Sequence, residues 1–356
     1  MGLRSLVVIA SIAGARGLDL MNALLKSPLY KRVMVPWSRQ MMIDTAAANG
    51  VPWASSVDWL RAQRDWSSMD VETADIPGYY RAPFHAYEEG NLCWEAAFEQ
   101  EVASKAVGAR NYPAFGADGE DAFRGAFDAA FVEAGARVPD GAVVVDIGSG
   151  TGHSTRRLAA QFPKAASFLG VDRSPYFVAV ARELPTIDGT GEHWVNDVSG
   201  DERVSFSCAD GAALPVADGT VDVCVLSLVV HELPPAATAA IVAEAYRVLR
   251  TGGQLWVGEM DFETDGYKKL RASPAYAFIR ATEPYLDVYA DFGASGVARA
   301  AVDAGFSAVR AVAATGRHYA LVADKRDGGG DATIDDRREE TAKPDTHLKT
   351  WESRAK

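Results

Sequence analysis

The spacing of apolar residues changes near residue 141. Beyond this point, short apolar runs rich in β-branched residues alternate with stretches whose apolar positions recur at helical spacing. The runs predict strands over 142–147, 167–171, 204–208, 221–226, 254–258, 308–312 and 318–322. The intervening stretches predict helices over 154–161, 175–184, 236–249 and 296–304. This alternation predicts parallel strands joined by crossover helices, in a sheet covered on both faces.

The last two predicted strands have a different connection. Residues 313–317 join them, and this segment is too short for a crossover helix. The connection therefore predicts a hairpin, with an antiparallel strand at the edge of the sheet. We expect an α/β fold with a seven-stranded, mostly parallel sheet and an antiparallel last strand, occupying residues 141–325.

Residues 26–140 have a helical pattern and many aromatic side chains. Helices are predicted over 92–107 and 120–134, and the turn Pro139-Asp140-Gly141 is the expected boundary between this helical cap and the sheet domain. One dense aromatic group contains Tyr79, Tyr80, Phe84, His85, Tyr87 and Trp94. Such a group is typical either of a lid over a planar, apolar ligand or of the packed core of the cap.

The two ends of the chain differ from its middle. Residues 1–25 contain a short apolar run that predicts either a targeting segment or an ordinary N-terminal helix. Residues 326–356 are nearly all small, polar or charged, which predicts a disordered tail. No other stretch predicts a transmembrane helix, so we expect a soluble body. The sequence gives no indication of the oligomeric state.

Charge and cysteine content exclude several classes of function. The formal net charge is -12 at pH 7, which disfavours nucleic acid as a partner because phosphate backbones attract basic surfaces. Cys93, Cys208 and Cys224 are not at the spacing of zinc or iron–sulfur sites. We therefore expect no metal site.

The central motif is a glycine-rich turn directly after the first predicted strand. Asp146 precedes it by two positions, and Gly148, Gly150 and Gly152 are spaced G-x-G-x-G around Ser149. Glycine lets a backbone turn tightly and approach a ligand closely. The dinucleotide fingerprint is instead G-x-G-x-x-G, so the spacing argues against an NAD site.

Two further carboxylates end the next two strands. Asp172 follows the second strand at the distance expected of an acid that binds a ribose, although it could instead cap the following helix. Asp210 follows the third strand, before Gly211, where a turn would also favour aspartate. Asp222 begins the fourth strand and is expected to be structural.

In this order the motifs resemble those of class I S-adenosylmethionine-dependent methyltransferases, which have a Rossmann-like fold. The resemblance covers residues 143–259 strongly, extends more weakly to 325, and is greatest for the UbiE-related methyltransferase type 11 group. Residues 79–92 also resemble uncharacterised plastid and cyanobacterial members, which implies a plastid or cytoplasmic location. The resemblance implies S-adenosyl-L-methionine as the cofactor, bound by Asp146, Gly148, Ser149, Gly150, Gly152, Asp172, Arg173, Asp210, Gly211, Ala212 and Leu228. Arsenite enzymes of this superfamily need several cysteines, which this chain lacks.

Candidate catalytic residues follow the fourth strand, which in this fold ends beside the methyl group. His231 and Glu232 lie there, and His231 is the first candidate for a general base because imidazole titrates near neutral pH. His85 in the aromatic group is a second candidate. His153 is expected at the methionine end of the cofactor. Glu259 and Asp261 could bind substrate or could be solvated loop charges.

These features predict a methyltransferase that acts on a small, apolar or aromatic acceptor. Two alternatives remain open at this stage. One is a protein that binds the cofactor without catalysis, and the other is an NAD-dependent oxidoreductase on a similar sheet, which would need a catalytic pair that we do not find.

Overall fold

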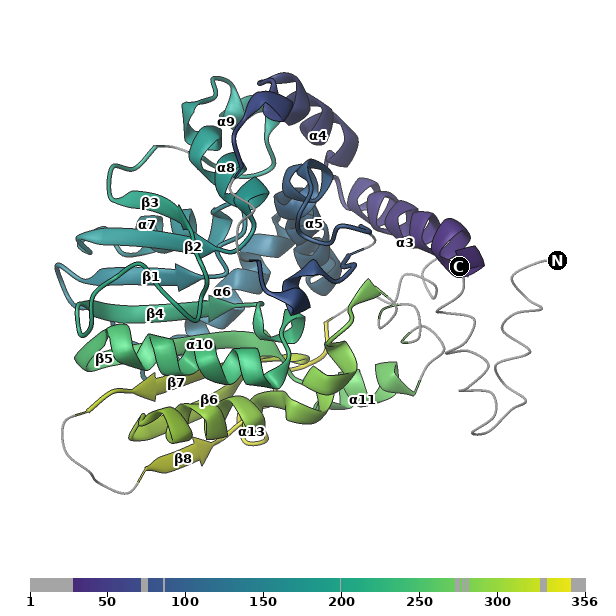
Figure 1. Ribbon diagram of the computed structural model, residues 1–356. Coiled ribbons are helices and arrows are strands. Elements are labelled where there is room, and N and C mark those ends of the chain that lie inside the picture. The colour runs from purple at the N-terminus through teal and green to yellow at the C-terminus, as the bar shows by residue number, and fades with distance from the viewer. Residues whose placement is uncertain are drawn as a thin grey trace.

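The computed structural model is shown as a ribbon in Figure 1. It describes residues 28–71, 76–85, 87–198, 200–272, 276, 279, 282–326 and 332–346. The predicted targeting segment over 1–25 and the last part of the predicted tail lie outside the described residues. Within the described residues, no helix is both long and apolar enough to cross a membrane.

The centre of the fold is an eight-stranded sheet with the strand order β3-β2-β1-β4-β5-β7-β6-β8. All seven strands predicted from the sequence are present. Strands β1 to β5 run parallel, and β7 is antiparallel to both of its neighbours. The strands are β1 (Val143–Ile147), β2 (Ser167–Asp172), β3 (Val204–Cys208), β4 (Val221–Ser227), β5 (Leu249–Met260), β6 (Ala308–Thr315), β7 (His318–Asp324) and β8 (Thr333–Asp336).

The far edge of the sheet differs from the prediction in two ways. The hairpin of β6 and β7 is confirmed, but β7 lies inside the sheet between β5 and β6. The edge is β8, which pairs in parallel with β6 and lies in the segment predicted to be a disordered tail. All four β8 residues are exposed, so hydrophobic patterning gave no signal for this strand. Buried ion pairs of Arg338 and Arg317 hold the segment in place instead.

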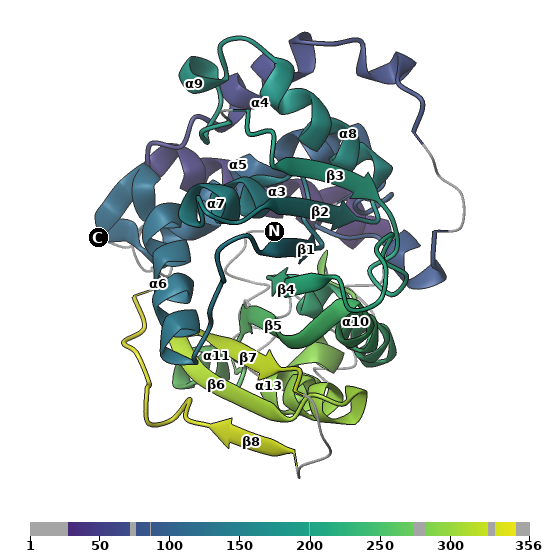
Figure 2. The ribbon, with the colours of Figure 1, turned by 90° about the vertical axis from the view of Figure 1, so that its left-hand side faces the viewer.

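Helices cover both faces of the sheet, as Figure 2 shows. On one face α6 and α7 pack against β1, β4, β5 and β7, and on the other face α10 and α13 form the main core with the same sheet. The helices are α3 (Pro28–Ala48), α4 (Trp53–Ala62), α5 (Trp94–Asn111), α6 (Gly119–Glu133), α7 (His153–Gln161), α8 (Pro175–Glu183), α9 (Thr190–His193), α10 (Pro235–Val248), α11 (Asp265–Arg271) and α13 (Leu286–Ala304).

The hydrophobic core does not stop at the predicted boundary near residue 141. Phe127 and Phe131 of α6 pack on the sheet, and the Phe131 ring stacks on Trp256 of β5 with centroids 5.4 Å apart. A Cβ atom on Gly258 would lie 2.9 Å from the Phe127 ring, so β5 has a glycine where α6 crosses it. Helix α6 is therefore part of the layer that covers the sheet.

Helices α3, α4 and α5 form the cap, which lies beside the carboxyl ends of the parallel strands (Figure 1). Its core is aromatic: Trp66 contacts both Trp94 and Phe98, and Trp94 meets Tyr176 of α8 edge to face. The aromatic group noted in the sequence is thus divided, because Trp94 belongs to this core. Tyr79, Tyr80, Phe84 and His85 lie instead nearer to the strand ends.

Candidate cofactor and methyl-transfer site

The turn between β1 and α7 has a conformation that requires glycine. Gly148, Gly150 and Gly152 have φ angles of +77°, +56° and +93°. A Cβ atom would lie 2.5 Å from Val229 at Gly148 and 2.4 Å from the Phe206 ring at Gly152. The turn therefore combines left-handed backbone with close approach on both sides, which is the geometry expected of a loop that wraps a ligand.

Asp172, at the end of β2, faces this turn. Its Oδ2 accepts a hydrogen bond from the Gly150 amide at 2.8 Å, and its Oδ1 accepts one from the Ser174 amide at 2.8 Å. The side chain is buried, and burial raises its pKa despite these hydrogen bonds. A buried carboxylate at this point is suited to hydrogen bonds from a sugar diol. The alternative of a helix cap is not what the structure shows, because Ser174 caps α8.

Two buried polar atoms beside the turn have no hydrogen-bond partner among the described residues. Asp146 Oδ2 accepts from the hydroxyls of Ser154 and Thr155, which holds the first turn of α7, but Asp146 Oδ1 is unpaired. The Ser149 hydroxyl, 3% exposed as a residue, is also unpaired. Buried polar groups normally have partners, so these two atoms fit a ligand that brings its own donors and acceptors, such as a methionine moiety.

The remaining predicted cofactor residues lie along the same edge of the sheet. Asp210 Oδ1 accepts from the Ala212 amide at 2.8 Å, and a Cβ atom on Gly211 would lie 2.9 Å from Ile147 of β1. Leu228 follows β4 with a φ of +58°, which is unusual for a residue other than glycine. Arg173 follows Asp172 and is half-buried.

His231 has a partner that changes its chemistry. Its Nδ1 lies 2.9 Å from Oε2 of Glu259, which is fully buried at the end of β5. Burial alone would lower the pKa of His231, but Glu259 and the carboxylates of Glu283 and Glu232 raise it to about 10. The imidazole is thus protonated at neutral pH. The expectation that His231 is the resting general base is therefore disfavoured by its surroundings.

The choice left open for Glu259 and Asp261 is also decided. Both side chains are buried, at 0% and 3% exposure, so neither is a solvated loop charge. Asp261 binds Arg338 through two hydrogen bonds of 3.0 Å, which makes it structural.

Glu232 is the group at this end whose charge changes near neutral pH. Its Oε2 accepts from the Asn91 amide at 3.0 Å. Burial and the neighbouring carboxylates of Asp172 and Glu283 raise its pKa to about 8, against the opposing charge of His231. His85 is exposed, has a φ of +47°, and lies close enough to His231 for an electrostatic interaction.

Sequence analysis missed Glu283, which lies just before α13. It faces His231 and Glu259, and burial raises its pKa. No motif marks this residue, and its neighbours in space are about 50 and 25 positions away in the sequence.

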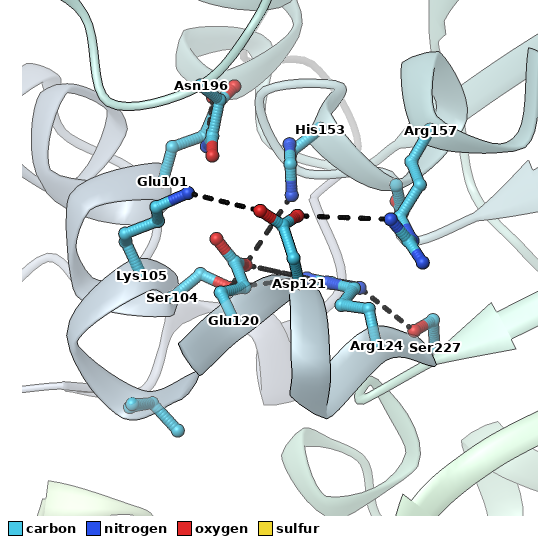
Figure 3. Close-up of polar contacts among 12 residues, drawn as sticks. Glu101, Ser104, Lys105, Glu120, Asp121, Arg124, His153, Arg157, Asn196 and Ser227 are labelled. Atoms are coloured by element: carbon cyan, nitrogen blue, oxygen red, sulfur yellow. Dashed lines mark hydrogen bonds and ion pairs between the residues drawn. The ribbon is translucent and has the colours of Figure 1, made fainter. Parts of the chain in front are cut away.

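A polar network joins the cap to the base of the glycine turn, and Figure 3 shows its residues. Asp121 lies between Lys105 and Arg157, while Arg124 spans from Glu120 to the Ser227 hydroxyl at the end of β4. His153 points to Glu120, with 3.5 Å between Nε2 and Oε1. His153 therefore belongs to this network, and the prediction that it faces the methionine end of the cofactor is not supported.

Helix α5 also contacts the turn directly. Gln100 Oε1 accepts from the Thr151 hydroxyl at 2.6 Å, and a Cβ atom on Gly150 would lie 2.7 Å from Gln100 Nε2. Glu101, fully buried, accepts from Thr151 and from Arg156 of α7. Helix α5 of the cap thus holds the glycine turn in place. No group of His, Cys, Asp and Glu side chains that could hold a metal ion occurs in the described part of the chain.

The chain is similar to known methyltransferases over part of its length. Residues 145–257 match the family model of the methyltransferase domain. An arsenite methyltransferase of Aquipseudomonas alcaligenes is 35% identical over 34% of this chain and 33% of its own length. The ubiquinone/menaquinone biosynthesis C-methyltransferase UbiE of Geotalea uraniireducens is 25% identical over 44% of this chain and 61% of its own length. A SAM-dependent methyltransferase structure from Aquifex aeolicus has a TM-score of 0.41 and 19% identity, over 56% of this chain and 89% of that chain.

The glycine turn, the two strand-end carboxylates and the family match define a class I S-adenosylmethionine-dependent methyltransferase domain. Within that class the domain is similar to UbiE over 44% of this chain. The match to the arsenite enzyme spans only a third of that relative, and the match to UbiE spans 61%.

Proposed function

We propose that this chain transfers a methyl group from S-adenosyl-L-methionine to a small-molecule acceptor. The proposal rests on the hydrogen bond from the Gly150 amide to Asp172, which places a buried carboxylate against a turn formed by glycines. Asp172 would accept from the ribose hydroxyls and Asp210 from the adenine amino group. The unpaired Ser149 hydroxyl and Asp146 Oδ1 would meet the methionine end.

Bound S-adenosylmethionine supplies an electrophilic methyl group, and the protein has to align the acceptor with it. His231, held by Glu259, contributes a fixed positive charge after the end of β4. We propose Glu232 as the group that takes the acceptor's proton when it is ionised, a form that becomes dominant as the pH rises through about 8. Asn91 would hold the Glu232 carboxylate in position.

The side chains at this end also bear on the acceptor. The sequence predicted an apolar or aromatic acceptor, yet His231, Glu232, Glu259 and Glu283 are all ionisable. We therefore propose an acceptor whose nucleophile is a hydroxyl or amine that loses a proton during transfer. The ring of Phe84 is also buried. The proposal therefore still allows an acceptor whose body is aromatic or apolar.

Calorimetric titration with S-adenosylhomocysteine tests the site. Asp172→Asn should weaken binding about 10- to 100-fold, because it removes a charge-assisted acceptor. Asp222→Asn is the matched control: Asp222 is also buried and accepts from a backbone amide, that of Val143 at 2.8 Å, but at the start of β1. Equal affinity in wild type and Asp172→Asn would refute the assignment, as would stronger binding of NADH.

Catalysis needs a separate assay. Incubation with the methyl-labelled cofactor and a metabolite extract should yield a labelled small molecule with wild type and much less with Glu232→Gln. A protein that binds S-adenosylhomocysteine but labels nothing in extracts from several sources would support the non-catalytic alternative.

A further inference from the structure

The segment Ile76–His85, here called the strap, lies between the cofactor edge and the residues that lead into α13. Two hydrogen bonds hold it on the α13 side. The Tyr285 hydroxyl donates to the Tyr79 carbonyl at 3.1 Å, and the His85 amide donates to the Thr282 carbonyl at 2.9 Å. Its own turn is closed by Arg81, which donates to the Ile76 carbonyl at 3.3 Å. The strap is thus an ordered part of the fold, anchored at its middle through the Tyr79 carbonyl and at its last residue, His85.

On the cofactor side the strap touches Asp172. The Tyr80 hydroxyl donates to Asp172 Oδ1 at 3.2 Å. Burial and the charge of Asp172 raise the pKa of Tyr80, so the phenol keeps its proton and remains a donor. Burial raises the pKa of the neighbouring Tyr79, and Asp210 is close enough for its charge to raise it further. Of two consecutive strap residues, Tyr80 is therefore bonded to the carboxylate assigned to the ribose, and Tyr79 is within electrostatic range of the one assigned to the adenine.

Counting acceptor sites shows that Tyr80 and a ribose compete. A carboxylate offers about four lone-pair sites. Asp172 already uses three of them, for the amides of Gly150 and Ser174 and for the hydroxyl of Tyr80. A ribose diol that donates twice needs two sites, which is one more than remain. The two amides are fixed by the glycine turn and by the start of α8, so of these three donors Tyr80 is the one that can leave.

We propose that Tyr80 is a built-in competitor of the cofactor: its hydroxyl takes an acceptor site on Asp172 that the ribose needs, and it is displaced when the ribose binds. This inference rests on the proposed function, since it takes Asp172 to be the ribose acid. Displacement of Tyr80 would lift the strap from the cofactor edge while its anchor to α13 persists. Glu232 lies close enough to Tyr80 to affect its ionisation, so the same movement would change the surroundings of the proposed proton acceptor.

Affinity of the Tyr80→Phe variant tests the proposal. The ring is retained, and the competing hydrogen bond to a charged acceptor is removed. Titration calorimetry should show the Kd for S-adenosylhomocysteine falling about tenfold below that of wild type. Tyr112→Phe, which removes a hydroxyl from a half-buried tyrosine packed on Phe115 and Phe123, should leave the Kd unchanged. An unchanged or higher Kd for Tyr80→Phe overturns the proposal.

Hydrogen exchange gives a readout that does not depend on the variant. Saturating S-adenosylhomocysteine should speed exchange of strap amides in the wild-type protein, because the strap loses its contact with Asp172. Slower exchange would mean that the strap closes over the cofactor, which also overturns the proposal. If the wild-type protein binds no S-adenosylhomocysteine at all, the proposed function fails; if it binds but Tyr80→Phe behaves as wild type, only the competitor role fails.

Discussion

Replacing Glu259 by glutamine tests whether His231 carries a charge in the resting protein. Glu259 is fully buried, its carboxylate contacts His231 Nδ1 at 2.9 and 3.0 Å, and it also accepts from the Met260 amide at 2.7 Å. Glutamine keeps the shape and removes the negative charge. The imidazolium would then be buried without its nearest counter-charge, and the pKa of His231 should fall.

The size of the effect follows from linkage. The pKa of His231 is raised from 6.5 to about 10 in the folded protein. The stabilisation is therefore complete below pH 6.5 and is lost as the pH rises through 10, with a slope of at most about 1.4 kcal/mol per pH unit. Over the whole window this amounts to about 5 kcal/mol at most. Removing one partner of a buried ion pair typically costs about 3–5 kcal/mol, which is the same range.

The assay is urea denaturation of wild type and Glu259→Gln between pH 6 and pH 9.5. The free energy of unfolding of wild type should exceed that of the variant by several kcal/mol at pH 6.5, and the difference should shrink as the pH rises. Glu95→Gln, at an exposed position on α5, is the control and should change little at any pH. A difference that stays constant from pH 6.5 to 9.5 would show that His231 is neutral, and its role as a resting general base would be restored.

Three further predictions concern other parts of the fold. Gly148→Ala should destabilise the protein by about 1–3 kcal/mol and abolish cofactor binding, because the added Cβ would lie 2.5 Å from Val229. Gly141 has a similar φ of +76° but open space around it, so Gly141→Ala should cost only about 1 kcal/mol in denaturant titrations. Arg338→Ala should lower the free energy of unfolding by about 3–5 kcal/mol, since it leaves the buried Asp261 without its ion-pair partner. Arg299→Ala breaks an exposed ion pair with Asp303 and should change the free energy of unfolding by less than about 1 kcal/mol. The pKa of Glu101 is lowered from 4.5 to about 2 because Arg156 and its other partners outweigh burial. Glu101 therefore contributes stability above pH 4.5 that is lost as the pH falls towards 2. Glu101→Gln should flatten the acid-denaturation curve, followed by circular dichroism, in that pH range.

The parts of the fold that were predictable are those that follow from local pattern. Most of the parallel strands are apolar runs, and α7, α8 and α10 were expected within one residue of their observed bounds. Strand β5 and helix α13 begin 5 and 10 residues earlier than expected, and the short helices α9 and α11 were not predicted. The cofactor edge was predictable for the same reason, because the carboxyl ends of parallel strands share one edge of the sheet. Asp172 and the glycine turn therefore met as expected.

What could not be predicted depends on pairs that are distant in the sequence. His231 and Glu259 are 28 positions apart, and only their contact shows that the histidine is charged. Tyr80 reaches Asp172 across 92 positions. Strand β8 was missed because its four residues bury no apolar surface, and its support comes from Arg338, whose partner Asp261 is 77 positions away. Pattern analysis detects burial, but it does not detect which charges meet.

The placement of β8 has a consequence for synthesis on the ribosome. Strand β7, which joins β6 to the sheet, is complete at residue 324, and β8 is complete at residue 336, a delay of about 0.6–2.4 s at common rates of 5–20 residues per second. During that interval the nascent sheet ends in β6, whose outer backbone groups have no strand to pair with, and such open edges favour association between chains. We expect the nascent chain to be prone to aggregation in this interval, so slow codons placed between residues 325 and 332 should lower the yield of folded protein.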